Sequence, residues 1–177
     1  MRSLLVLASV VAATAAAQAA EPPSKGWKKL CPAGTAGVAG CVLKGGKMVA
    51  FCSAGGGLDY MSNDMKSKPE VLDSDTLVYR FGKPGKVEMA FPKGTAGSAG
   101  KFRGRGFASM YHNLIWLGFT NGGFRYVYHK HSFFWRGGGG FYANHLLRVE
   151  QGGRTVARFT CDDHDVSRKP DFDIGPL

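Results

Sequence analysis

The sequence predicts an all-β protein: a single-domain antiparallel β-sandwich or flattened barrel of about eight strands, stapled by disulfides. Apolar-rich runs with alternating character are separated by short turns that contain glycine. No convincing amphipathic helix follows the first twenty residues. The 26 glycines show no repeat period, so we interpret them as turn and bulge residues and exclude a solenoid.

Residues 1–20 have the pattern of a cleaved signal peptide. A basic start at Arg2 precedes the apolar run Leu4–Ala17, and Ala17 and Ala19 are small residues suited to a cleavage site. The run is too short to span a bilayer, and no later run is long enough. We therefore expect a periplasmic or secreted protein with no transmembrane segment after cleavage.

The rest of the chain is expected to form one domain. Residues 21–40 are interpreted as an N-terminal lead and a Cys-closed loop, 41–161 as the β-sandwich domain and 162–177 as a C-terminal tail. Without Arg2, 22 Lys and Arg face 13 Asp and Glu, so the exported chain has a net charge of +9. A chain of this size buries enough surface for a proper core.

The four cysteines predict two disulfides, because the exported part of the chain meets an oxidising compartment. Three pairings are possible. We expect Cys31 to pair with Cys41, closing a Gly/Ala-rich loop, and Cys52 to pair with Cys161, tying an early strand to the last one. The cysteines include no C-x-x-C pair, which disfavours a zinc site.

Turn residues predict the hairpins along the chain. The paired runs are 41–44 with 47–53, 76–81 with 86–91, and 141–150 with 154–161, around Gly45-Gly46, Gly82–Gly85 and Gln151–Gly153. Gly55–Ser74 is expected to be a long surface loop, and Lys93–Gly106 a basic loop that is mobile when unbound. Residues 107–119 favour a bent strand, or two strands, over a helix, because they are rich in β-branched and aromatic residues and a hairpin turn follows directly.

The central hairpin is the candidate binding element. Asn121, Gly122 and Gly123 form its predicted turn. The strand after the turn alternates, with Phe124, Tyr126, Tyr128 and Lys130 on one face and Arg125, Val127, His129 and His131 on the other. Exposed aromatic and Arg groups are common interface anchors. The alternative is that the aromatic residues pack into the core while the charged residues face water.

Enzymatic chemistry is not predicted. The sequence has no G-x-S-x-G, H-E-x-x-H or Walker pattern. His129 and His131 could share a metal with the segment Cys161–Asp165, but the spacing fixes no third ligand, so neither a metal nor a cofactor is expected. The acids Asp73, Asp75, Asp162 and Asp163 lie in expected loops and do not form a catalytic pair.

The positive charge makes an anionic partner plausible, such as a cell-wall or outer-membrane polymer. The densest cluster of cations is Lys101, Arg103 and Arg105. Nucleic acid is an unlikely partner, because an exported protein seldom meets it.

Two segments carry a resemblance. They are Tyr79–Glu88, which continues to Phe91-Pro92, and Asn121–Tyr126. Together they resemble a group of uncharacterised small exported bacterial proteins, over a length from about Cys31 to the Gly-Pro tail. The order of signal peptide, hairpins and a Gly-turned hairpin followed by Tyr is more distantly similar to periplasmic inhibitors of invertebrate-type lysozymes.

The inhibitor resemblance implies an eight-stranded β fold with a Ser-Gly-x-x-Tyr loop that enters the lysozyme cleft. Gly123 matches the motif Gly and Tyr126 matches its Tyr, while Gly122 stands in place of Ser and lacks its hydroxyl. The implied binding residues are Asn121, Gly122, Gly123, Arg125 and Tyr126, and the implied partner is a lysozyme or another envelope-acting protein. The alternatives are a β-sandwich that binds an anionic envelope polymer, and a structural periplasmic protein without enzymatic activity.

Overall fold

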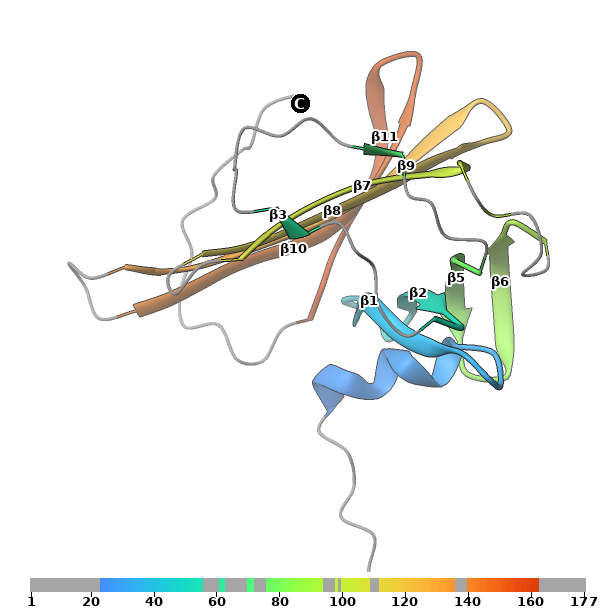
Figure 1. Ribbon diagram of the computed structural model, residues 1–177, viewed down its shortest axis with the longest axis horizontal. Helices are drawn as coiled ribbons and strands as arrows, with labels where there is room; N and C mark the ends of the chain where they lie inside the picture. The colour runs from blue at the N-terminus through green and yellow to red at the C-terminus, as the bar shows by residue number, and fades with distance from the viewer. Residues whose placement is uncertain are drawn as a thin grey trace, which may run out of the picture.

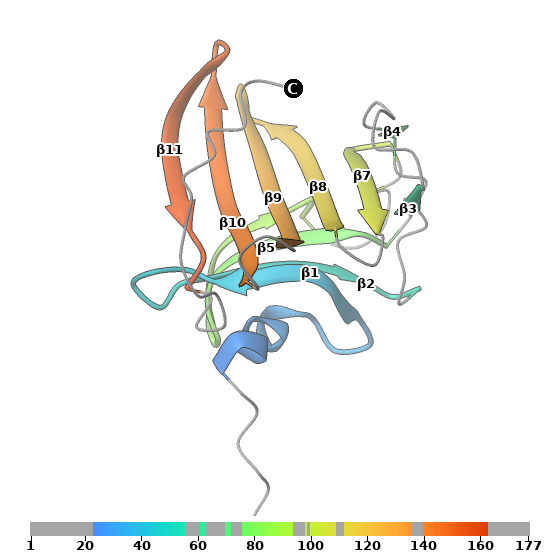
Figure 2. The ribbon, with the colours of Figure 1, turned by 90° about the vertical axis from the view of Figure 1, so that its left-hand side faces the viewer.

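The computed structural model describes residues 23–55, 61–62, 70–71, 76–93, 98, 100–108, 112–135 and 140–162. The predicted signal peptide, most of the expected loop at 55–74, Gly137–Gly139 and the tail from residue 163 lie outside the described residues. Within them the predicted all-β fold is confirmed: two sheets form a sandwich and do not close into a barrel. In Figures 1 and 2 the strands of the smaller sheet run across the base of the larger sheet.

The smaller sheet has four antiparallel strands in the order β1-β2-β5-β6. Their bounds are Ala36–Val42 for β1, Met48–Ser53 for β2, Val78–Lys83 for β5 and Lys86–Phe91 for β6. The turn between β1 and β2 contains Gly45 (φ 97°) and Gly46 (φ 77°), and Gly85 (φ 75°) lies in the turn between β5 and β6. These positive φ values suit glycine, and both predicted hairpins are confirmed.

The larger sheet has seven strands in the described residues, with the order β11-β10-β9-β8-β7-β3 and β4 also paired with β7. The long strands are β7 (Phe102–Ala108), β8 (His112–Asn121), β9 (Phe124–Trp135), β10 (Gly140–Gln151) and β11 (Arg154–Thr160). The two-residue strands β3 (Met61–Ser62) and β4 (Glu70–Val71) lie within the expected surface loop. Strands are confirmed within 107–119, where 107–108 end β7 and 112–119 belong to β8, and the hairpins at Asn121–Gly123 and Gln151–Gly153 are confirmed.

The core lies where the two sheets cross. Phe51 of β2 is fully buried, with its ring centre 5.2 Å from that of Tyr79, 6.2 Å from that of Phe102 and 5.7 Å from that of Tyr128. The Tyr128 hydroxyl donates to the carbonyl of Gly40 at 3.2 Å, which links the sheets directly. We call the side of the larger sheet that meets this core its inner face, and the opposite side its outer face.

A 3-10 helix, η1 (Pro23–Leu30), covers the other side of the smaller sheet (Figure 1). The N-terminal lead expected within residues 21–40 therefore contains a helix from Pro23. Trp27 and Leu30 are buried against β2 and β5. A Cβ at Gly37 or at Gly40 would fall 2.6 Å from the Trp27 ring, so both positions need glycine for the indole to lie on β1. The side chains of Trp27 and Leu30 dock the polar segment together with the hydrogen bond that Arg80 Nη1 donates to the Leu30 carbonyl at 3.3 Å.

Both disulfides form, but the expected pairing is wrong. Cys31 pairs with Cys52 and Cys41 pairs with Cys161. Cys41 lies opposite Val49 in the β1–β2 hairpin and therefore shares the core side of the sheet with it. Cys52 points to the opposite side, where η1 ends and delivers Cys31. Cys41 could not reach Cys31 through the sheet.

The expected basic loop at Lys93–Gly106 is also wrong in its second half, because β7 begins at Phe102 and pairs with β8 along its length. Phe102 is fully buried in the core, while Arg103 is exposed on the outer face. Gly104 and Gly106 occupy the next inward positions and are buried. The inward row of this strand thus contains few apolar side chains, and this is why it looked like a loop.

Candidate functional site: the outer face of the larger sheet

The turn of the central hairpin is exposed. Asn121 ends β8 opposite Phe124 of β9, and Gly122 (φ 59°) and Gly123 (φ 80°) connect them in a two-residue turn. A Cβ added at either glycine would meet nothing within 4 Å. The three residues therefore project from the sheet as a narrow tip.

Tyr126 and Arg125 lie on opposite faces of the sheet. The Tyr126 ring stacks on Phe119, with ring centres 4.9 Å apart, on the inner face. It also lines an apolar cavity of about 440 Å³ between the two sheets. The Arg125 side chain is on the outer face, 44% exposed. The structure thus brings Asn121, Gly122 and Gly123 together at the tip, and separates Arg125 from Tyr126.

The alternation predicted for this strand is confirmed by its register. Tyr126 and Tyr128 lie opposite Phe119 and Leu117, which belong to the core. Val127 and His129 lie on the outer face, opposite Gly118 and Trp116. The expectation that the aromatic residues pack inward is therefore correct for the tyrosines.

Arginines dominate the outer face. Strands β7 to β11 contain seven Lys and Arg but a single acid, Glu150, and five of these cations lie on the outer face: Arg103, Arg105, Arg125, Arg148 and Arg158. One cross-strand row follows from the register of the four strand pairs. It consists of Arg103, Gly118, Val127, Arg148 and Arg158. Arg103 and Arg158 are exposed, so charge is presented at both ends of this row.

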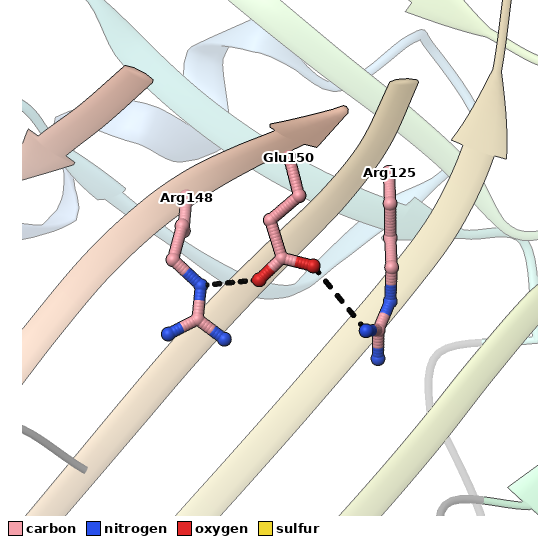
Figure 3. A network of polar contacts seen from close by, with 3 residues as sticks. All are labelled: Arg125, Arg148 and Glu150. Atoms are coloured by element: carbon pink, nitrogen blue, oxygen red, sulfur yellow. Dashed lines mark hydrogen bonds and ion pairs between the residues drawn. The ribbon is translucent and has the colours of Figure 1, made fainter. Parts of the chain in front are cut away.

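Glu150 links two arginines of the outer face, Arg125 and Arg148, as Figure 3 shows. Arg125 Nη1 donates to Glu150 Oε2 at 3.3 Å, and Arg148 Nε lies 2.6 Å from Glu150 Oε1 as an ion pair. The Glu150 side chain is only 13% exposed, whereas Arg125 keeps 44% of its side-chain surface. One carboxylate offsets one of the two positive charges, so the group keeps an excess of positive charge.

The ring of Trp116 also contacts Arg125. Its guanidinium carbon lies 5.4 Å from the centre of the Trp116 ring, in a cation–π arrangement. Trp116 is only 3% exposed. Between Glu150 and Trp116, the Arg125 guanidinium has a defined position, and this reduces the entropy lost when it binds a ligand.

Histidines occupy the other end of the outer face. The ring centre of His131 lies 6.1 Å from that of His112 and 6.2 Å from that of His129. Burial lowers the pKa of His129 most, and together with the nearby His131, Arg148, His145 and Arg105 it brings that pKa to about 4. Burial and His112 also lower the pKa of His131. At neutral pH, His129 and His131 are therefore uncharged, and Arg and Lys provide the charge of the outer face.

The possible metal site at His129 and His131 gains no support from the geometry. Cys161, considered as a further ligand, is bonded to Cys41. Among the residues that the structure describes, no three His, Cys, Asp or Glu are grouped in a way that could hold a metal ion.

Comparison with known proteins gives no relatives: no family model, no curated protein and no solved structure matches the chain. In the described part of the chain, no helix is both long enough and apolar enough to cross a membrane.

The cations of β7 could be identified from the sequence, but the strand that carries them could not. Lys101, Arg103 and Arg105 were recognised as a cluster in a loop, whereas Arg103 and Arg105 lie on a strand beside β8. The sequence does contain a strand signal here, because Phe102, Gly104 and Gly106 alternate with the two arginines. Arg148 and Arg158 were not singled out, because only the register of β10 and β11 places them in one row with Arg103.

Proposed function

We propose that this protein is an exported binding module that holds an anionic cell-envelope polymer on the outer face of its larger sheet, without catalysis. The observation that carries the proposal is the row of Arg103, Arg148 and Arg158, in strands that contain one acid. Guanidinium groups suit this role because they stay charged and bind carboxylate, sulfate and phosphate oxygens with paired donors.

The length of the row favours an extended ligand over a small one. Neighbouring strands lie about 4.8 Å apart, so the four steps from β7 to β11 separate Arg103 and Arg158 by roughly 19 Å. A single small anion cannot contact both ends of such a row. A chain with repeated negative charges can, and its binding energy is then shared among several sites.

The compartment fits the same proposal. Both disulfides join residues of the described domain, and disulfides persist mainly in oxidising environments. This supports the periplasmic or secreted location expected from residues 1–20, where envelope polymers are accessible.

The exposed hairpin tip supports a second candidate, the loop-inserting lysozyme inhibitor. Asn121 and Arg125 would then contact acidic groups of the enzyme cleft. The inward packing of Tyr126 on Phe119 gives Tyr126 a supporting role in such a loop instead of a direct one.

The test is a binding assay of the mature protein on immobilised polyphosphate, polygalacturonate and dextran sulfate, with uncharged dextran as the control. The proposal predicts retention on charged polymers that falls as salt rises, because screening weakens exposed charge contacts. Retention on uncharged dextran, or on none of the polymers, would overturn it. In parallel, inhibition of lysozymes of each class that is lost in Asn121→Ala and survives moderate salt would support the second candidate.

A further inference from the structure

A pocket lies beside the start of β7, where Phe91 and Phe119 of the core side and several cations of the outer face line one space. Its cavity of about 210 Å³ is lined in part by Lys101, Arg103 and Arg125 together with Thr120, Trp116 and Gly118. Three cations and one hydroxyl thus line one small space, and the described residues around it include no acid. Drug-sized ligands occupy pockets of roughly 300 to 1,000 Å³, so this one is suited to a single charged group.

Two features keep the pocket open and its donors in place. Gly118 provides part of its wall, and a Cβ there would fall 2.8 Å from Trp116 Cη2, so a side chain does not fit without displacing the indole. Arg125 rests over Trp116 and is anchored by Glu150. A guanidinium has five N–H donors. Because Glu150 takes one of them in the structure, further donors can face a ligand.

We infer that this pocket binds a phosphate monoester group, such as a terminal phosphate on a saccharide of the polymer. This inference rests on the proposed function and names the chemical group that the outer face selects. A phosphate monoester carries about −1.5 to −2 charges and three acceptor oxygens near neutral pH. Two guanidinium groups, an ammonium and a hydroxyl match that charge and number of oxygens better than they match one carboxylate.

The outer row offers a matched pair of variants. Arg103 and Arg158 are both exposed and both lie in the same cross-strand row, but only Arg103 lines the pocket. Arg103→Gln and Arg158→Gln remove the same charge from the same face. They should weaken the binding of dextran sulfate, which has no phosphate monoester, to similar extents, whereas only Arg103→Gln should weaken the binding of a small phosphate.

The experiment titrates the protein with inorganic phosphate, glucose 6-phosphate and glucuronate, and follows the indole N–H signal of Trp116 by NMR. The signal should shift and saturate with both phosphate compounds. Glucuronate should bind at least about tenfold more weakly, because it forms fewer charged hydrogen bonds. Arg103→Gln should raise the dissociation constant for glucose 6-phosphate about tenfold, and Arg158→Gln should leave it within about twofold.

Three results would overturn the phosphate assignment: equal affinity for glucuronate, equal effects of the two variants, or no saturation with either phosphate compound. If the charged polymers still bind in any of these cases, the proposed function stands and the pocket assignment alone fails. If inorganic phosphate binds but glucose 6-phosphate does not, the pocket is a site for the free ion, and the assignment to a saccharide phosphate is wrong.

Discussion

The inner and outer faces of the larger sheet are built from the same strands and have opposite chemistry. On β9, Tyr126 stacks on Phe119 in the core, while its neighbour Arg125 lies on the outer face beside Glu150. On β7, Phe102 is fully buried and Arg103 is exposed. Adjacent residues therefore have separate roles, and the parity of a residue along its strand decides which role it has. Substitutions at neighbouring positions should separate stability from binding.

The largest expected effect comes from the disulfide that closes the inner core. Loop entropy gives a stabilisation of about 5 kcal/mol for Cys41–Cys161, with a sequence separation of 120, and about 3 kcal/mol for Cys31–Cys52, with a separation of 21. Cys41→Ser/Cys161→Ser should therefore lower the free energy of unfolding more than Cys31→Ser/Cys52→Ser. Urea unfolding of the two double variants measures the difference, and the reverse order would contradict this account of the core.

The next prediction compares the loss of stability caused by substitutions on the two faces of one strand, β7. Phe102→Ala should lower the free energy of unfolding by about 3 to 5 kcal/mol, because it leaves a cavity among the core aromatics. Arg103→Gln should change it by no more than about 0.5 kcal/mol, since the side chain is exposed. Thermal or urea unfolding of both variants measures the two changes in stability. A large loss of stability in Arg103→Gln would mean that the outer arginines hold the fold.

The architecture could be predicted because its turns are marked in the sequence. Positive φ at Gly45, Gly85, Gly122 and Gly152 needs glycine, and each of these residues lies between two strand-like runs. Strand alternation predicted that Tyr126 and Tyr128 share one face, but not that this face is the inner one. Local rules of this kind need no knowledge of distant contacts.

The failures each concern a tertiary relation. β7 has Gly104 and Gly106 at inward positions, so the apolar signal of a strand was absent. The cysteine pairing depended on which side of the smaller sheet each thiol faces, and the parity of Cys41 and Cys52 around Gly45-Gly46 contained that information. The row that joins Arg103 to Arg158 depends on the register of four strand pairs, and no local pattern contains it.

The histidine end of the outer face should make stability depend on pH. The pKa of His129 is about 4 in the folded protein, below the ordinary value of 6.5, so the unfolded chain binds the proton more readily. The stabilising contribution of neutral His129 is complete above about pH 6.5 and is lost as the pH falls towards 4, by roughly 3 kcal/mol in all. His129→Gln should remove this part of the dependence of the unfolding free energy on pH.

Urea unfolding of the parent and of His129→Gln at several pH values between 7 and 4 measures that contribution. Other titrating groups act in both proteins, so the difference between the two curves isolates His129. Parallel curves would show that His129 is not held neutral by burial.

The smallest expected effect is a gain of binding. Glu150→Gln removes the acid that competes with a ligand for Arg125 and Arg148. Exposed and partly exposed ion pairs contribute about 0 to 1 kcal/mol, so the fold should lose little stability while affinity for polyphosphate rises by about two- to fivefold. Isothermal titration calorimetry measures both proteins under the same salt conditions. Weaker binding by Glu150→Gln would show that anchoring of Arg125 by the carboxylate contributes more to affinity than the competition with a ligand removes.

The central claim is that the polymer binds to cations at defined positions on the outer face, and that net charge alone does not explain binding. Two triple variants of equal charge test it. Arg103→Gln/Arg148→Gln/Arg158→Gln removes three cations from the outer row, and Lys44→Gln/Lys83→Gln/Lys86→Gln removes three exposed cations outside it. Affinity for the retained polymer is measured at several salt concentrations. The affinity of the outer-row variant should fall at least about a hundredfold and depend less steeply on salt, whereas the control should stay within about threefold of the parent. Equal losses in the two variants would contradict the claim.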